Sequence, residues 1–171
     1  PSWDLFLGLF FGVGVAYSLL LARDRIVMTL VATYLSLVAT LTVGDTVIDF
    51  FQGNTFLFNQ VWLPLRASPF IITSGLFVAF IILLMSKAVF SVEFNPKRPI
   101  LSFSELIAYG FLLSGLVVSS MLSFLPGTSR EPILAASEIA QRVNQFHDWW
   151  IVIPVLLLIV SGFRAYSSSR E

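Results

Sequence analysis

Two carboxylates, Asp45 and Asp49, are the side chains whose type and spacing best suit chemistry in this sequence. They lie four residues apart after an apolar run, so on a continuing helix both would occupy one face. Arg66 could reach them. Such a pair suits a cation site or an acidic ring at the outer entrance of a pore. The alternative is two solvated acids at a helix end, and we expect each to be dispensable on its own.

The other titratable candidates have structural explanations. Glu105 follows Ser102 at the spacing of a capping box. His147 is the only histidine and precedes Asp148, which can cap a helix, whereas a metal site needs several ligands. Cysteine is absent, and no serine has a histidine base within its own apolar run. We therefore expect no enzyme and no metal or other cofactor.

Small and hydroxyl side chains form faces on three apolar runs. A stripe on the second run recurs at steps of four, three and four residues and consists of Thr29, Thr33, Ser36 and Thr40. The first run contains Gly8 and Gly12, and the fourth contains Ser104, Ala108, Gly115, Ser119 and Ser123. Small residues let helices approach closely, so tight packing is the expected role. The alternative is a narrow polar path for water or a small neutral solute.

The composition is that of a membrane protein. Hydrophobic residues make up 57% of the chain and charged residues 12%, whereas soluble domains are about a quarter charged. The net charge is zero and the basic residues are scattered, so nucleic acid is not an expected partner. The lipid bilayer is, and the 171 residues suit a single integral membrane domain over 1–171.

Five apolar runs predict an all-α, polytopic transmembrane helical bundle. The expected spans are residues 5–22, 26–43, 70–90, 103–125 and 146–166. The third opens with Ser68-Pro69, a side-chain N-cap followed by the residue best suited to the first helical position. The apolar part of the last run is too short for a hydrocarbon core of about 30 Å. The expected span is therefore extended, and it includes Trp149, Trp150 and Tyr166 as interfacial anchors. Pro154 inside it can kink the helix. No span has an ionisable residue at its centre, which argues against a proton-coupled transporter or a voltage sensor.

Two connections have a character of their own. Residues 44–69 are too aromatic for a solvated loop and too interrupted for a span, so we expect interfacial or re-entrant structure there. Residues 132–146 place Ile139 and Val143 on one helical face and Glu138 on the other, which predicts an amphipathic helix on the outer surface. Thr128 and Glu131 ahead of it have the spacing of a capping box.

The basic residues predict that the N-terminus is outside and the C-terminus inside. In that orientation, the inner segments hold seven of the ten basic residues: Arg23, Arg25, Lys87, Lys97, Arg98, Arg164 and Arg170. The outer segments hold Arg66, Arg130 and Arg142. Every successive loop agrees with the alternation, which supports the span assignment as well as the orientation.

The pattern resembles the colicin V production (CvpA) family of small bacterial membrane proteins. The likeness covers residues 3–146 and lies in Trp3-Asp4, the basic turn Arg23-Asp24-Arg25, a longer outer connection, two further spans and an amphipathic segment after Leu125-Pro126. The glycine usual in the family's turn is missing, and the fifth span has no counterpart in its four-span pattern. The resemblance implies a bacterial inner-membrane protein that supports envelope assembly, secretion or integrity.

From these features we expect a non-enzymatic integral membrane subunit or scaffold. It would act by packing with copies of itself or with larger membrane partners, because its small-residue faces exceed the obvious needs of one five-helix unit. The alternative function is a small channel or permease for water or a neutral solute, with the hydroxyl stripe of the second span as its path.

Overall fold

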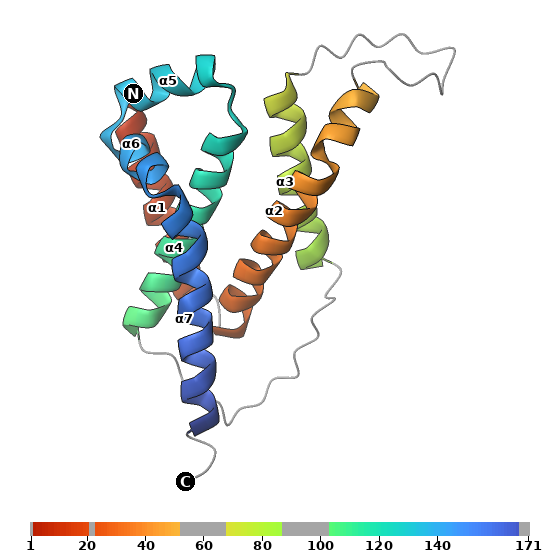
Figure 1. Cartoon of the computed structure of the whole chain (residues 1–171). Helices are drawn as coiled ribbons and strands as arrows, with labels where there is room; N and C mark the ends of the chain where they lie inside the picture. The colour runs from red at the N-terminus through yellow and green to blue at the C-terminus, as the bar shows by residue number, and fades with distance from the viewer. Residues whose placement is uncertain (1, 21–22, 52–67, 87–102, 168–171) are drawn as a thin grey trace. The chain divides into compact units, whose positions relative to one another are not determined.

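The computed structural model describes residues 2–20, 23–51, 68–86 and 103–167, and the regular structure in these ranges is entirely helical (Figure 1). The chain divides into two compact units, residues 1–30 with 90–171 and residues 31–89. The first unit contains the start of α2 and the following helices: α1 (Trp3–Leu20), α4 (Phe103–Phe124), α5 (Gly127–Ala136), α6 (Glu138–Gln145) and α7 (His147–Ser167). The second contains the rest of α2 (Arg23–Phe51) and α3 (Pro69–Ser86).

Four helices, α1 to α4, are long and apolar enough to cross a membrane. Helices α6 and α7 add a fifth crossing if they count together as one span. That span would be broken, because the two helices meet at an angle of 66°. The predicted class, an all-helical chain with several candidate membrane spans, is confirmed. The sharp bend lies at Phe146 between the two helices, whereas α7 continues through Pro154.

Helix α2 is longer than the apolar run that predicts it. The run ends at Val43, but the helix continues through both aspartates to Phe51. The first part of the 44–69 connection is therefore a helical extension, and residues 52–67 lie outside the described residues. Hydropathy predicts where the apolar part of a helix ends, and the helix itself can continue beyond that residue.

Helix α3 begins where its sequence predicts. The backbone amide of Ile71 donates to Ser68 Oγ at 3.4 Å and to Ser68 O at 2.9 Å. Pro69, the first helical residue, has no amide hydrogen to leave unpaired. The expected capping box of α4 involves Ser102, which lies outside the described residues, as do 87–102 in general.

The segment expected as one amphipathic helix over 132–146 is two helices. Ser137 adopts an extended conformation, φ −143° and ψ 118°, which ends α5 and begins α6. Its hydroxyl oxygen accepts the Ala140 amide hydrogen at 3.0 Å, and Gln141 Nε2 donates to Leu134 O at 2.7 Å across the break. Helix α5 already begins at Gly127 after Pro126 and has no side-chain cap, so the expected Thr128 capping box does not form.

Candidate functional site

The closest helix contact in the first unit is the crossing of α1 and α4, which run antiparallel (Figure 1). A Cβ on Gly14 would overlap the hydroxyl of Ser114, and a Cβ on Gly110 would overlap the hydroxyl of Ser18. Ser18 Oγ also donates to the Leu106 carbonyl across the interface at 2.8 Å. Each helix thus contributes one glycine and one serine four residues apart, the small-residue arrangement that lets membrane helices pack with close backbones.

A hydrophobic core closes one end of this unit. It consists of the buried residues Leu7, Val118, Leu122, Ala140 and Val143. The apolar face of α6 therefore packs on α1 and α4, and its polar face is turned away. Amphipathicity predicted the apolar face correctly, but could not say whether lipid or protein would cover it.

Asp4 joins the start of α1 to the start of α6 by hydrogen bonds. Its carboxylate oxygen Oδ1 accepts the Ser137 hydroxyl hydrogen at 2.6 Å and the Ile139 amide hydrogen at 3.1 Å. Both donors lie at the N-terminus of α6, where unpaired amides and the helix dipole favour negative charge. The sequence gives no signal for this contact, because Asp4 and Ser137 lie 133 positions apart.

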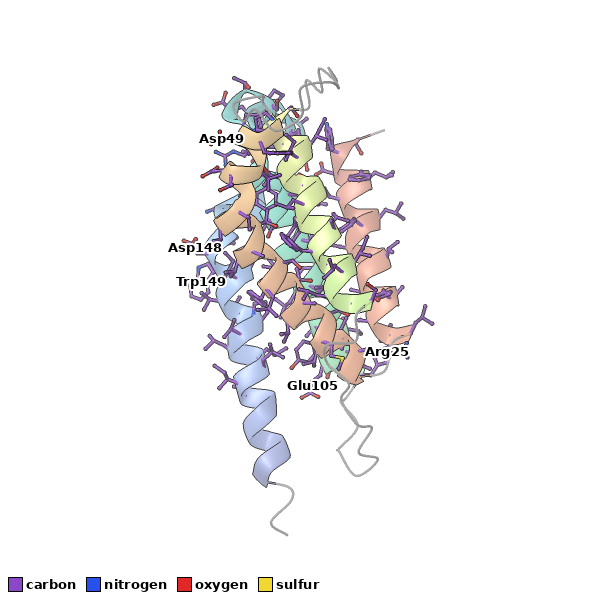
Figure 2. All side chains as sticks on the ribbon, turned by 90° about the vertical axis from the view of Figure 1, so that its right-hand side faces the viewer. Arg25, Asp49, Glu105, Asp148 and Trp149 are labelled. Carbon is purple, nitrogen blue, oxygen red and sulfur yellow. The ribbon has the colours of Figure 1, made fainter. Side chains whose placement is uncertain are left out.

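Trp150 packs α7 against α4. Its ring occupies the space that a Cβ on Gly115 would need. Phe11 and Phe111 complete an aromatic cluster, with ring centroids 5.9 Å and 5.4 Å from that of Trp150. The indole Nε1 is buried and has no hydrogen-bond partner among the described residues. Trp150 is thus partly buried against the core, whereas Trp149 is 56% exposed and projects away from α7 together with Asp148 (Figure 2).

Ser119 and His147 form a hydrogen bond that links α4 to the start of α7. The distance between Ser119 Oγ and His147 Nδ1 is 2.5 Å. A serine beside a histidine is the beginning of a nucleophile–base pair. Ser119 is only 1% exposed, however, and therefore gives a substrate no approach to its hydroxyl. The arrangement supports a structural link, which the search for a base within each span missed because the residues are on different helices.

The hydroxyl stripe of α2 is buried along its whole length. Thr29 is 8% exposed, Thr33 1%, and Ser36 and Thr40 are both 0%. Thr29 Oγ1 donates to the Arg25 carbonyl at 2.8 Å, and Ser36 Oγ donates to the Ala32 carbonyl at 2.7 Å. These donors are used inside their own helix, which is compatible with tight packing. Thr40 Oγ1 differs, because it is buried without a hydrogen-bond partner in the described part of the chain.

The acid pair is carried by the helical extension of α2. Asp45 and Asp49 are one turn apart and both exposed, and Asp49 lies near the end of the helix opposite Arg25 (Figure 2). Arg66 lies outside the described residues. Glu105 is in the first turn of α4, at its N-terminal end. Within the described ranges, no three acidic or histidine side chains gather as metal ligands would.

The predicted small-residue faces divide between packed and open surroundings. On α4, Gly115 and Ser119 contact α7, whereas Ser104 is exposed. On α1, a Cβ added at Gly8 or Gly12 would meet no heavy atom of the described chain within 4 Å. The GxxxG pair thus has no packing partner there, and the pair that does, Gly14 with Ser18, was not singled out by its sequence.

No protein-family model, curated protein or solved structure matches the chain.

Proposed function

We propose that the chain is a non-enzymatic integral membrane subunit or scaffold that packs with copies of itself or with larger membrane partners. One observation supports this most directly. Gly8 and Gly12 form an open small-residue face on α1, while Gly14 and Ser18 on a different face of the same helix make the contact with α4.

The open face has the form of a helix-packing surface. Gly8 and Gly12 lie one turn apart and are flanked by exposed apolar side chains, Leu5 at 66%, Leu9 at 64% and Val13 at 59%. Glycine inside a helix costs about 1 kcal/mol relative to alanine. Lipid alone does not offset that cost, whereas a partner helix that approaches the backbone closely makes additional packing contacts. A flat glycine strip between bulky residues therefore favours a protein partner over lipid.

The cellular setting is part of the proposal. The resemblance to the colicin V production family suggests a bacterial inner membrane and a role in envelope assembly or secretion. The basic residues favour the N-out, C-in orientation. The contact between Asp4 and Ser137 supports the alternation on which that orientation depends, because it brings the N-terminus and α6 to the same end of the first unit.

Cysteine labelling tests the orientation, since the chain has no cysteine of its own. We expect Gln145→Cys to react with an impermeant thiol reagent in intact cells and Lys97→Cys to react only after the cells are opened. Position 145 is exposed on α6, and position 97 lies outside the described residues. The reverse pattern would refute the orientation.

The mass of the particle in mild detergent tests the assembly. We expect the wild type to be larger than one chain, and the double variant Gly8→Leu/Gly12→Leu to be reduced to a single chain. Gly75→Leu on α3 is a matched control, because Gly75 is also exposed with no heavy atom of the described chain within 4 Å of an added Cβ. A wild type that is a lone monomer without a co-purifying membrane protein would contradict the proposal.

The alternative function, a channel or permease for water or a small neutral solute, is favoured by a single observation. Thr40 places on the stripe that would line the path a buried hydroxyl that has no hydrogen-bond partner among the described residues. The other hydroxyls with a described bond, those of Thr29 and Ser36, donate to their own helix. Flux of a neutral solute into liposomes, lost in a Thr33→Ala/Ser36→Ala variant that still assembles, would favour this alternative over packing.

A further inference from the structure

Thr40 is an exception among the buried hydroxyl residues of α2. Its side chain is fully buried, and Oγ1 reaches no donor or acceptor within the described residues. Thr42, two positions further on, is exposed and still donates to the Val38 carbonyl at 2.8 Å. Threonine in a helix usually makes this bond to the carbonyl four residues earlier. Burial makes an unpaired hydroxyl more costly. Thr40 therefore needs a hydrogen-bond partner more than the exposed Thr42 does, yet it has none among the described residues.

Gly44 leaves space one turn away on the same face of α2. It is buried, yet a Cβ built on it would meet no heavy atom of the described chain within 4 Å. Protein interiors are closely packed, and a buried glycine normally marks a close approach of neighbouring atoms. Gly110, which is buried, shows that behaviour in this chain, and Gly44 does not. The space beside Gly44 is therefore unfilled by the residues that the structure describes.

An unpaired hydroxyl and an unfilled space on successive turns have a common explanation. Leaving a buried hydroxyl unsatisfied costs about 1–3 kcal/mol. Purely apolar voids stay empty, whereas a void with a polar wall can hold a water molecule that satisfies the wall. We propose that Thr40 and Gly44 form a hydration site in α2, in which a water molecule occupies the space left by Gly44 and hydrogen-bonds to Thr40 Oγ1.

The site would accept a small neutral molecule with hydrogen-bonding capacity, and water is the ligand to which we commit. A single hydroxyl supplies one donor and two acceptor positions and no net charge, so it does not replace the hydration shell of an ion. The hydration site is independent of the assembly proposal, which depends on α1. If the hydroxyl stripe lines a path for water or a small neutral solute, the hydration site is one binding position along that path.

Hydrogen exchange of an introduced thiol tests the site in the chain reconstituted in liposomes, because this exchange requires only that water reaches the sulfur. We expect the thiol of Thr40→Cys to exchange its hydrogen in heavy water at least about tenfold faster than the thiol of a buried neighbour, as followed by the S–H infrared band. The control is Leu37→Cys, which is buried in the same helix.

Filling the space tests the role of Gly44. We expect Gly44→Val, added to Thr40→Cys, to slow the thiol hydrogen exchange to the rate of Leu37→Cys. A Thr40→Cys exchange rate no faster than that of Leu37→Cys in the absence of the second change would overturn the proposal. Unchanged exchange after Gly44→Val would also overturn it, since the water would not occupy that space.

A measurement on the unaltered protein guards against a variant that fails to fold. In water-edited solid-state NMR of the wild type, we expect magnetisation to reach the Thr40 side chain from water faster than it reaches Leu37, which is 7% exposed on the same helix. Equal build-up at the two residues would refute the hydration site. The mass of the particle in detergent, which tests the assembly proposal, has no part in this result.

Discussion

Helix α1 presents two pairs of small residues, and only one pair has a packing partner in the described chain. Gly14 and Ser18 pack against Gly110 and Ser114, so closely that an added Cβ would overlap a hydroxyl. Gly8 and Gly12 have the same spacing and open space around them. The comparison teaches that a small-residue pair marks a possible close approach, and that its surroundings decide whether the approach is made within the chain or is left for another molecule.

The packed pair provides the largest expected effect. Gly14→Leu should destabilise the first unit by about 3 kcal/mol or more, because its side chain must displace α4 along the crossing. Gly12→Leu should leave the stability of the isolated chain almost unchanged. The unfolding midpoint of both variants in detergent checks the difference, and equal losses of stability would remove the distinction between the two faces.

The hydroxyl stripe of α2 is also buried, so larger side chains there should lower the stability, as they should at Gly14. Thr33→Leu and Ser36→Leu should each cost about 1–3 kcal/mol through overpacking. Alanine at either position should be nearly neutral, because interhelical hydroxyl bonds in membranes average about 0.6 kcal/mol. The same unfolding midpoints provide the measurement. A larger loss with alanine than with leucine would show that polarity, not size, matters in the stripe.

The junction of α5 and α6 should give an intermediate effect. Ser137→Ala removes the N-cap of α6 and one hydrogen bond of Asp4, and loss of such a cap costs about 1 kcal/mol. Hydrogen exchange at the Ala140 amide, which donates to Ser137 Oγ, should become several-fold faster. Ser129→Ala on exposed α5 is the control. Unchanged protection at Ala140 would mean that the packing of α6 alone holds it in place.

The exposed acid pair should give the smallest effect. Asp45→Asn and Asp49→Asn should each leave folding and assembly unchanged, because both carboxylates are already exposed at the end of α2. Membrane abundance and particle mass in detergent check this. Loss of assembly or activity in Asp49→Asn at normal abundance would revive the cation-site hypothesis.

The sequence predicts the helical class well, because long apolar runs without central charges have few other solutions. It predicts the start of α3 for an equally local reason, the Ser68-Pro69 cap. The end of α2 is not predicted, since Asp45 and Asp49 interrupt the hydropathy without interrupting the helix. The bonds of Asp4 to Ser137 and of Ser119 to His147 join residues far apart in the chain, so no spacing rule contains them. Gly14 and Ser18 are not predicted as a contact, because the two-glycine pattern of Gly8 and Gly12 lies on another face of the same helix.

Photo-crosslinking in native membranes tests the central claim, that the Gly8–Gly12 face of α1 is covered by protein. A photoreactive amino acid would replace Leu9, which is 64% exposed beside the two glycines, and in a control Ile82, which is 61% exposed on α3. We predict a discrete protein adduct from position 9, identified by mass spectrometry as a second copy of the chain or another membrane protein, and lipid adducts alone from position 82. Lipid adducts alone from position 9 would contradict the account.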